Sequence, residues 1–357
     1  MLSRLIAPAS YVQGPDVLGN RDAYRSLSAG RALVLGGETA LLVVEDELRD
    51  GLAAVDIDVV AVVRGVDSCT FAIIDEFDEH ARDHEVELVV GVGGGVALDT
   101  AKAVAEQAET ELAIVPTIAS TDAPCSSVAV VYDNEGGFDG YVHRRRNPEL
   151  VLADTAVIAA APPRFLRYGM GDAFATRFEA ETVANAWENT HAGGVPTDAA
   201  VTLARRSFEN VAAYGPAALA AVERDAVTPA VERIVETNTL LSGVGFESGG
   251  LAAAHAFGKG FSRTGVKAPH GLLIAFSTVA GLVLEDREPS VLAEAVDVAR
   301  SVGIDVTLAD LEAEDDVYAV ATAACSDDTT MGNLPFEVTP SAAADALRTA
   351  DELLVNG

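Results

Sequence analysis

The chain has 357 residues, of which 49% are hydrophobic and 22% charged, a composition typical of a folded globular protein. This length exceeds what one ordinary core requires, so we expect two domains. The 55 acidic residues outnumber the 24 basic ones and give a formal net charge of −31. So negative a surface repels polyanions, and we expect neither nucleic acid nor a membrane as a partner.

The acidic residues are spread over predicted helix faces instead of forming one tail. The only lysines are Lys102, Lys259 and Lys267. An acid-rich, lysine-poor surface resembles that of proteins from a salt-loving cytoplasm, where screening removes the self-repulsion of the charges. The sequence therefore predicts a halophilic, cytoplasmic protein that loses structure or oligomeric order when salt is removed.

Cysteine usage and hydropathy agree with that location. Cys69, Cys125 and Cys325 are scattered and odd in number, which predicts reduced thiols and no disulfide framework. No apolar run reaches the length needed to span a bilayer, and residues 1–13 lack the profile of a signal peptide.

The first part of the chain alternates short apolar runs with helical segments, the pattern of a parallel α/β unit. We expect strands at residues 31–35, 59–63, 88–91, 112–115 and 150–153, helices at 38–50, 71–84 and 98–107, and a β-hairpin at 128–142. The sequence therefore predicts a Rossmann-like α/β domain with a parallel sheet over residues 1–160.

The character changes at Pro162-Pro163, which we take as the domain boundary. Alanine- and leucine-rich segments follow at helical spacing. We expect helices at 164–185, 197–214, 227–242, 249–260, 271–284, 290–302 and 340–354. Residues 161–357 are therefore predicted to form an all-α domain.

A glycine-rich turn at residues 91–95 joins a predicted strand to a predicted helix. Backbone N–H groups in such a turn can approach a phosphate closely, and the helix N-terminus adds partial positive charge. The spacing is neither that of a P-loop nor a clean G-x-G-x-x-G. The run alone fits a phosphate-binding turn and a tight structural turn equally well.

A hydroxyl-rich loop at residues 116–127 follows the next strand. The carboxyl ends of parallel strands form the ligand-binding edge of an open sheet. Asp122 in this loop can hydrogen-bond a polyol or accept a proton. The alternative is a structural turn in which Asp122 caps a helix.

Two of the six histidines stand apart from the others. His255 lies in an apolar, small-residue helix, and His270 follows before the next predicted helix; the others, His80, His84, His143 and His191, are expected to face solvent. A lone histidine on an apolar helix is more often a core residue than a ligand. Asp172 lies among apolar and small residues, where an unpaired charge is costly. Together with the two histidines it would make the open three-ligand site of catalytic zinc.

These segments together resemble the glycerol dehydrogenases of the metal-dependent (iron-containing type) polyol and alcohol dehydrogenase superfamily, nearly from end to end. The resemblance is carried by residues 11–14, 91–95, 98–102, 116–124 and 161–164, and most specifically by 238–256. It implies the dehydroquinate synthase-like fold of that superfamily and a homo-oligomer. It also implies oxidation of glycerol at C2 to dihydroxyacetone by metal-assisted hydride transfer to NAD(P)+, and the reverse reduction.

The same resemblance implies the site residues. Asp172, His255 and His270 would ligate one divalent metal, with Zn²⁺ the expected ion, and would bind the substrate through it. Asp122 matches the acid that contacts the substrate hydroxyl. The matching cofactor positions are Gly93, Gly94, Gly95, Val96, Ala97, Leu98, Asp99, Thr117 and Ser120 around the pyrophosphate and ribose, and Ser126, Val128 and Tyr132 on the nicotinamide side.

One departure concerns the choice of cofactor. The family usually has an Asp that binds the adenosine ribose at the position of Gly37, with Glu38 the available substitute. Loss of that carboxylate weakens discrimination against NADP, so NAD is expected and NADP stays possible. A second departure is the segment from His255 to His270, which is shorter than usual.

Several alternatives remain open at this point. sn-Glycerol-1-phosphate dehydrogenase shares fold, metal and dinucleotide, but residues 144–146 are the only basic run and fit a solvated strand edge better. Another vicinal-diol dehydrogenase fits the same chelation chemistry. A lyase of the dehydroquinate-synthase branch would need more lysines, and a non-catalytic paralogue would not need the ligand set.

Overall fold

The computed structural model describes residues 2–356, which form two compact units. The α/β unit comprises Ile6–Phe165 and Ala220–Leu240, and the helical unit comprises Leu166–Leu219 with residues 2–5 and 241–356. A single boundary after residue 160 was expected. In the structure, residues 2–5 belong to the helical unit although they precede the α/β segment in the sequence. Residues 220–240 belong to the α/β unit although they lie between two segments of the helical unit.

Polar contacts hold both segments in place. In the helical unit, Ser3 bridges Val195 in parallel fashion, and Arg4 donates to the Ala192 carbonyl at 3.2 Å. In the α/β unit, Gln13 Nε2 donates to the Glu232 carboxylate at 2.6 Å, and Tyr11 and Thr239 share a hydrogen bond of 2.8 Å. Hydrogen-bond pairing across a long sequence separation is not visible in hydrophobic periodicity.

The α/β unit is built on a six-stranded parallel sheet with the order β1-β8-β5-β4-β2-β3. Its strands are β1 (Tyr11–Gly14), β2 (Arg31–Gly36), β3 (Asp58–Arg64), β4 (Leu88–Gly93), β5 (Glu111–Pro116) and β8 (Leu150–Asp154). The five predicted strands are confirmed, with ends extended by one to two residues. The edge strand β1 was not predicted, because its residues are all half-buried and show no alternation.

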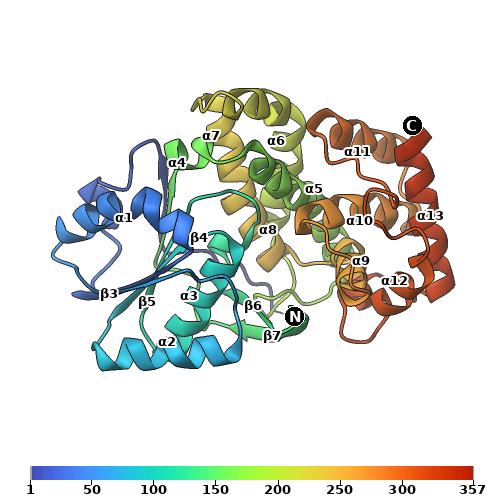
Figure 1. Ribbon diagram of the computed structural model, residues 1–357. Helices are drawn as coiled ribbons and strands as arrows, with labels where there is room; N and C mark the ends of the chain where they lie inside the picture. Colours follow the sequence, from blue (N-terminus) through green and yellow to red (C-terminus); the bar gives the residue numbers. More distant parts are fainter. Residues whose placement is uncertain (1, 357) are drawn as a thin grey trace. The chain divides into compact units, whose positions relative to one another are not determined.

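Successive side chains along a strand pack alternately into two hydrophobic cores. Leu33 and Leu35 face a core shared with α2 (Phe71–Asp83) and α3 (Gly95–Gln107), while Ala32 and Val34 face a core shared with α1 (Glu38–Ala53). Figure 1 shows α1 on one side of the sheet and α2 and α3 on the other. The predicted hairpin is present as β6 (Val128–Tyr132) and β7 (Phe138–His143), followed after β8 by the short α4 (Thr155–Ala160).

The carboxyl edge of the sheet gathers the predicted cofactor segments. The register aligns Gly36 with Val92 and Gly93 with Pro116. The Gly37 N–H donates to the Val92 carbonyl at 3.3 Å, and the Thr117 N–H donates to the Gly93 carbonyl at 3.1 Å. The Gly37 turn, the glycine-rich turn and the hydroxyl-rich loop therefore start side by side, as an open parallel sheet requires of its ligand edge.

The π-helical turn Thr237–Leu241 leads from the α/β segment 220–240 into the helical unit. The helices of this unit and those leading into it are α5 (Pro163–Ala186), α6 (Asp198–Val222), α7 (Pro229–Glu236), α8 (Ser242–Gly249), α9 (Ala253–Arg263), α10 (His270–Leu284), α11 (Pro289–Val302), α12 (Val317–Ala324) and α13 (Pro340–Asn356). A core lined by Phe257, Phe261 and Phe276 joins α9 and α10 to α12 and α13. Within residues 2–356, no helix combines the length and apolar character needed to cross a membrane.

The predicted helices 227–242 and 249–260 place a helix break between residues 242 and 249, and this position was wrong. The chain stays helical from Pro229 through the turn Thr237–Leu241 to Gly249, and breaks at Gly250, whose φ is +98°. The glycines of α8 serve packing instead of termination. A Cβ on Gly245 would lie 2.6 Å from Thr176, and one on Gly249 would lie 2.8 Å from Ala180. The short helix α12 was not predicted.

Acidic residues occupy backbone positions that usually favour glycine. Of the eight non-glycine residues with positive φ in the described chain, seven are acidic: Asp16, Asp56, Glu85, Glu109, Asp225, Asp286 and Glu312. Several of them directly follow a helix, where a negative charge opposes the helix dipole. Salt screens this unfavourable charge, so its cost should fall as salt rises, and the halophilic character stays a prediction.

Glu85, which follows α2 at φ +50°, offers a test of this interpretation. We expect Glu85→Gly to raise the free energy of unfolding by about 1 kcal/mol at low salt, because both strain and charge are removed. The gain should shrink in molar salt, and Glu85→Gln should reproduce only its salt-dependent part. Denaturant unfolding at two salt concentrations measures both variants; a Glu85→Gln variant with the wild-type salt dependence would contradict the charge argument.

Candidate metal and cofactor sites

Three helices of the helical unit bring the predicted metal ligands together. Asp172 lies on α5, His255 on α9 and His270 at the first position of α10. One ligand atom from each lies within 4.8 Å of the others. The Asp172 side chain is fully buried, whereas the His270 ring is 49% exposed. The cluster therefore has a closed carboxylate side and an open imidazole side, as a site for an exchangeable substrate needs.

The donor set fits a divalent metal ion. His270 Nε2 lies 3.5 Å from Asp172 Oδ1. Two ligands about 2.0–2.1 Å from a tetrahedral ion are about 3.4 Å apart, so this pair is spaced to share one. Asp172 and Glu179 are both buried carboxylates, and together they carry the charge that a dication balances. Burying them without such compensation would be costly.

Paired glycines allow the approach of α5 to α10. A Cβ on Gly171 would lie 2.0 Å from the Gly271 carbonyl oxygen, and a Cβ on Gly271 would lie 1.8 Å from the Tyr168 carbonyl oxygen. Each glycine precedes or follows a metal ligand directly, Asp172 in α5 and His270 in α10. The backbone contact therefore sets the distance between these two ligands.

Glu179 is a site residue that the sequence analysis missed. It is buried on α5, two helical turns after Asp172, and its Oε2 lies 2.6 Å from His255 Nδ1. Its spacing of seven positions from Asp172, which places both carboxylates on the same helix face, was the available signal. Without the spatial pairing, the residue is indistinguishable from any other helical glutamate.

The glycine-rich turn has the shape that close backbone approach requires. Gly93 adopts φ +137°, and a Cβ on Gly91 would lie 2.5 Å from the Ala101 Cβ. No side chain caps the N-terminus of α3 at Gly94, and Gly94, Gly95 and Val96 are at least partly exposed. The N–H groups of this helix end face outward from the sheet edge, where an anion would meet them.

Other predicted cofactor residues pack in the core of the α/β unit or take part in its buried hydrogen bonds. Ala97 and Leu98 pack in the core beneath α3. Lys102 is fully buried, and its ammonium donates to Asp99 Oδ1 at 3.0 Å, Ser126 Oγ at 3.2 Å and the Val128 carbonyl at 2.8 Å.

Burial raises the pKa of Asp99, and the Lys102 charge opposes that rise. The second Asp99 oxygen accepts from the Val130 N–H at 3.2 Å. The Asp99 and Ser126 side chains thus join α3 to β6, so we assign them to positioning the turn and the loop, and their direct contact with the cofactor stays a prediction.

The hydroxyl-rich loop carries Asp122 at the carboxyl edge of the α/β unit. Asp122 is buried and precedes the short turn Ala123–Cys125, but its side chain makes no capping hydrogen bond there. The structural alternative of a helix cap therefore fails for this residue. Asn238 Nδ2 donates to the Ala119 carbonyl at 2.9 Å, and Lys102 donates to the Ala123 carbonyl at 2.7 Å. The loop is thus held on both sides of Asp122.

The remaining predicted residues lie at the same edge or beside it. Thr117 is buried, Ser120 is half-buried and Glu38 is exposed at the first turn of α1. Tyr132 ends β6, and burial raises its pKa to about 12. The hydroxyl of Tyr132 therefore stays protonated at physiological pH.

The basic run at 144–146 directly follows β7, and Arg145 and Arg146 are solvent-exposed as expected, whereas Arg144 is not. Arg144 is buried and donates to the Thr110 carbonyl at 3.0 Å. Arg145 pairs with Glu106 and Glu109, and Arg146 pairs with Glu149. These guanidinium groups serve the structure of the α/β unit.

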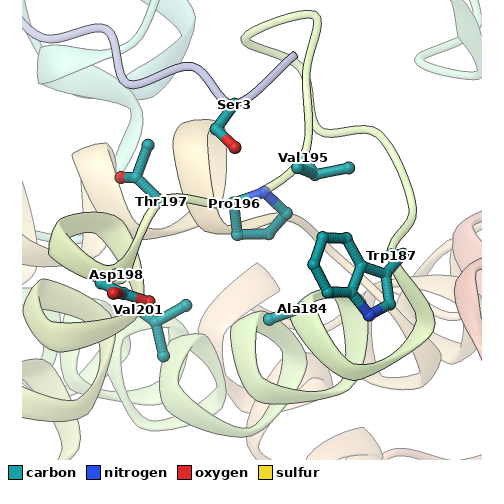
Figure 2. A pocket seen from close by; sticks show the side chains of 8 residues that line it. All are labelled: Ser3, Ala184, Trp187, Val195, Pro196, Thr197, Asp198 and Val201. Carbon is teal, nitrogen blue, oxygen red and sulfur yellow. The ribbon is translucent and has the colours of Figure 1, made fainter. Parts of the chain in front are cut away.

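A half-open pocket of about 360 Å³ lies elsewhere in the helical unit. Its lining is Ser3, Ala184, Trp187, Val195, Pro196, Thr197, Asp198 and Val201. Figure 2 shows Trp187, Val195 and Pro196 gathered on one side, with Thr197 and Asp198 on the other. None of the predicted site residues lines it, so it takes no part in the site described above.

Comparison with known proteins places the chain among alcohol and glycerol dehydrogenases. Residues 8–155 match the family described as iron-containing alcohol dehydrogenase. A glycerol dehydrogenase of Pseudomonas putida is 41% identical over 97% of this chain and 96% of its own length. A glycolaldehyde reductase of Halobacterium salinarum is 40% identical over 99% of this chain and 98% of its own.

The fold is similar to that of a probable glycerol dehydrogenase from Sinorhizobium meliloti. Its crystal structure matches with a TM-score of 0.92 and 35% identity, and the match covers 100% of both chains. The similarity thus extends over both units and includes the segments that carry the metal cluster and the glycine-rich turn. The chain therefore belongs to the iron-containing alcohol dehydrogenase family.

Proposed function

We propose that this protein oxidises glycerol at C2 to dihydroxyacetone, with hydride transfer to NAD(P)+, and catalyses the reverse reduction. The observation that carries the proposal is the cluster of Asp172, His255 and His270, in a chain similar over nearly its whole length to glycerol dehydrogenases. Two imidazoles and one carboxylate leave the fourth position of a tetrahedral ion open, and expansion to five-coordination would admit two adjacent oxygens of a substrate.

Each group of residues has a distinct task in this proposal. A divalent ion held by Asp172, His255 and His270 would lower the pKa of the bound hydroxyl when present. Asp122 contacts the substrate hydroxyl and orients it. The free N–H groups at Gly94 to Val96 hold the cofactor pyrophosphate, with Thr117 and Ser120 near the ribose. Ser126, Val128 and Tyr132 shape the nicotinamide side.

We propose zinc as the resident metal. The buried Asp172 and the Nε2 atom of His270 supply borderline donors at a spacing that suits a tetrahedral ion. A set of two histidines and one carboxylate also accepts iron or manganese. Metal analysis of the protein as isolated from its natural host or from a host grown with each metal distinguishes them.

A second candidate activity is the reduction of glycolaldehyde. It is favoured by the 40% identity to the glycolaldehyde reductase of Halobacterium salinarum. Glycolaldehyde, like dihydroxyacetone, carries a carbonyl next to a hydroxyl, so both present two adjacent oxygens to the same donor set. The two activities are distinguished by kcat/KM.

The experiment that tests the function is a substrate-by-cofactor activity matrix in molar salt. It includes glycerol, 1,2-propanediol, ethylene glycol, glycolaldehyde and glycerol 1-phosphate with NAD and with NADP. We expect the highest kcat/KM for glycerol among the alcohols. Turnover of glycerol 1-phosphate but not glycerol would overturn the proposal, as would absence of turnover with every diol despite bound metal.

Cofactor choice gives a separate prediction at Gly37. This residue has φ −63°, and a Cβ added to it would have the Val66 carbonyl oxygen as its nearest neighbour, at 4.0 Å. A side chain therefore fits without strain. We expect Gly37→Asp to raise the NAD-to-NADP ratio of kcat/KM at least about tenfold, because a carboxylate there repels a 2′-phosphate and hydrogen-bonds ribose hydroxyls. Gly37→Asn is the uncharged control; an unchanged ratio in Gly37→Asp would place the adenosine ribose elsewhere.

A further inference from the structure

We propose that Glu179 is a positioning residue that presets the metal site before the ion binds, by fixing both the ring of His255 and the start of the helix that carries it. The inference rests on the proposed metal-dependent function for its relevance to catalysis. The positioning role itself is measurable without substrate, through the metal affinity of the site and through which nitrogen of the His255 imidazole carries the proton.

The Glu179 carboxylate uses its two oxygens for two different tasks. Oε2 lies 2.6 Å from His255 Nδ1. Oε1 accepts from the backbone N–H of Ala252 at 2.8 Å and from that of His255 at 3.0 Å. The side chain is 4% exposed, so water does not compete for these contacts. All partners belong to the helical unit.

The contact at Oε2 decides which imidazole nitrogen carries the proton. An ionised carboxylate only accepts hydrogen bonds, so Nδ1 of His255 must be the donor. The neutral ring then has its lone pair on Nε2, the atom that can bind a cation. Histidine ligands that donate their other nitrogen to a carboxylate are held in one orientation and are more basic.

The contact at Oε1 replaces a missing helix cap. α9 begins after Gly250, and its N-cap residue Ala252 provides no capping side chain. The first turn of a helix leaves N–H groups without intrahelical partners, and Glu179 satisfies two of them with a negative charge at the positive end of the helix dipole. His255 lies in this first turn, so the cap also fixes the position of its Cα.

The arrangement predicts separable consequences for two substitutions. Glu179→Gln keeps an oxygen for the two backbone N–H groups but presents an NH₂ donor to Nδ1. The ring proton must then move to Nε2, the atom required for the metal. Glu179→Asp retains the charge but shortens the reach. Glu181→Gln is the matched control: Glu181 lies on the same helix and pairs with Arg177, Arg205 and Arg287.

The experiment measures zinc affinity by chelator competition and the His255 tautomer by long-range ¹H–¹⁵N NMR of the metal-free full chain. We expect Glu179→Gln to weaken zinc binding about 10–100-fold and to shift the neutral ring to the Nε2–H tautomer, with the circular dichroism spectrum of the fold retained. Glu179→Asp should lie between wild type and Glu179→Gln, and Glu181→Gln should bind zinc as wild type does.

Wild-type zinc affinity and an Nδ1–H tautomer in Glu179→Gln would overturn the proposal. If Glu179→Gln does not fold, Glu179→Asp decides, and wild-type affinity in that variant would overturn it as well. A wild-type protein that binds zinc through His255 but does not oxidise glycerol would contradict the proposed function and leave the role of Glu179 intact. The two failures are thus distinguishable.

Discussion

Replacing Lys102 with methionine is expected to lower the free energy of unfolding by roughly 3–5 kcal/mol, because it leaves a buried carboxylate without its charge partner. The Lys102 ammonium is fully buried and donates to Asp99, Ser126 and two backbone carbonyls, those of Ala123 and Val128. Its loss also frees the loop that carries Asp122. We therefore expect weaker cofactor binding together with the loss of stability.

The pH dependence identifies the cause of this loss. Burial already raises the pKa of Asp99 in the wild type, and the Lys102 charge lowers it again. Without Lys102 the folded-state pKa rises further above the unfolded value. The deficit relative to wild type should thus be smallest at acidic pH, where Asp99 is protonated in both states of both proteins, and grow once pH exceeds the raised folded-state pKa of Asp99 in the wild type.

The double variant Lys102→Met with Asp99→Asn is the control. It removes the buried charge, so much of the lost stability should return while the loop contacts stay broken. Denaturant unfolding of wild type and both variants across pH measures these differences. A single variant with a pH-independent deficit that Asp99→Asn does not reduce would show that the ion pair is not the cause.

Gly271→Ala is expected to abolish metal binding and activity without changing any ligand. A Cβ at this position would lie 1.8 Å from the Tyr168 carbonyl oxygen, far inside van der Waals contact, so α10 must move away from α5. Misplacement of a catalytic group by about 1 Å can cost about 10²-fold in rate. We expect at least that loss in kcat/KM for glycerol, with a parallel loss in zinc affinity.

Gly19→Ala provides the matched control, because nothing lies within 4 Å of a Cβ there. That variant should keep wild-type zinc affinity and activity. Zinc titration and steady-state kinetics measure both proteins. Full zinc affinity in a folded Gly271→Ala variant would refute the claim that the glycine contact sets the distance from Asp172 to His270.

Much of the fold followed from local patterns. The strands β2, β4, β5 and β8 are largely buried and β3 is half-buried, and all five appear as short apolar runs, so they were predictable. The break at Gly250 was not. Glycines inside α8 look like helix breakers in sequence, yet they permit close packing against α5, a property of the facing helix. β1 is held by pairing with β8 and by the side-chain hydrogen bond between Tyr11 and Thr239. Neither contact produces hydrophobic periodicity in the sequence.

The candidate site was predictable to a similar degree. Asp172, His255 and His270 could be named because each is an unusual residue in an apolar segment, and the family resemblance joined them. Glu179 could not be named, since its role depends on a contact across 76 residues. Asp99 was assigned to the cofactor through the family resemblance, which stays a prediction, and the ion pair between its carboxylate and Lys102 was not predicted. Buried charge pairs are recognisable only in three dimensions.

The central claim is that the cluster of Asp172, His255 and His270 makes a glycerol oxidation site by binding a divalent metal. Its most direct test is glycerol-dependent reduction of NAD or NADP by the full chain in molar salt, measured as isolated, after chelation and after reloading with zinc. We expect activity that chelation removes and zinc restores, and we expect no activity in His255→Ala. Undiminished glycerol oxidation by metal-free protein, or by His255→Ala, would contradict it.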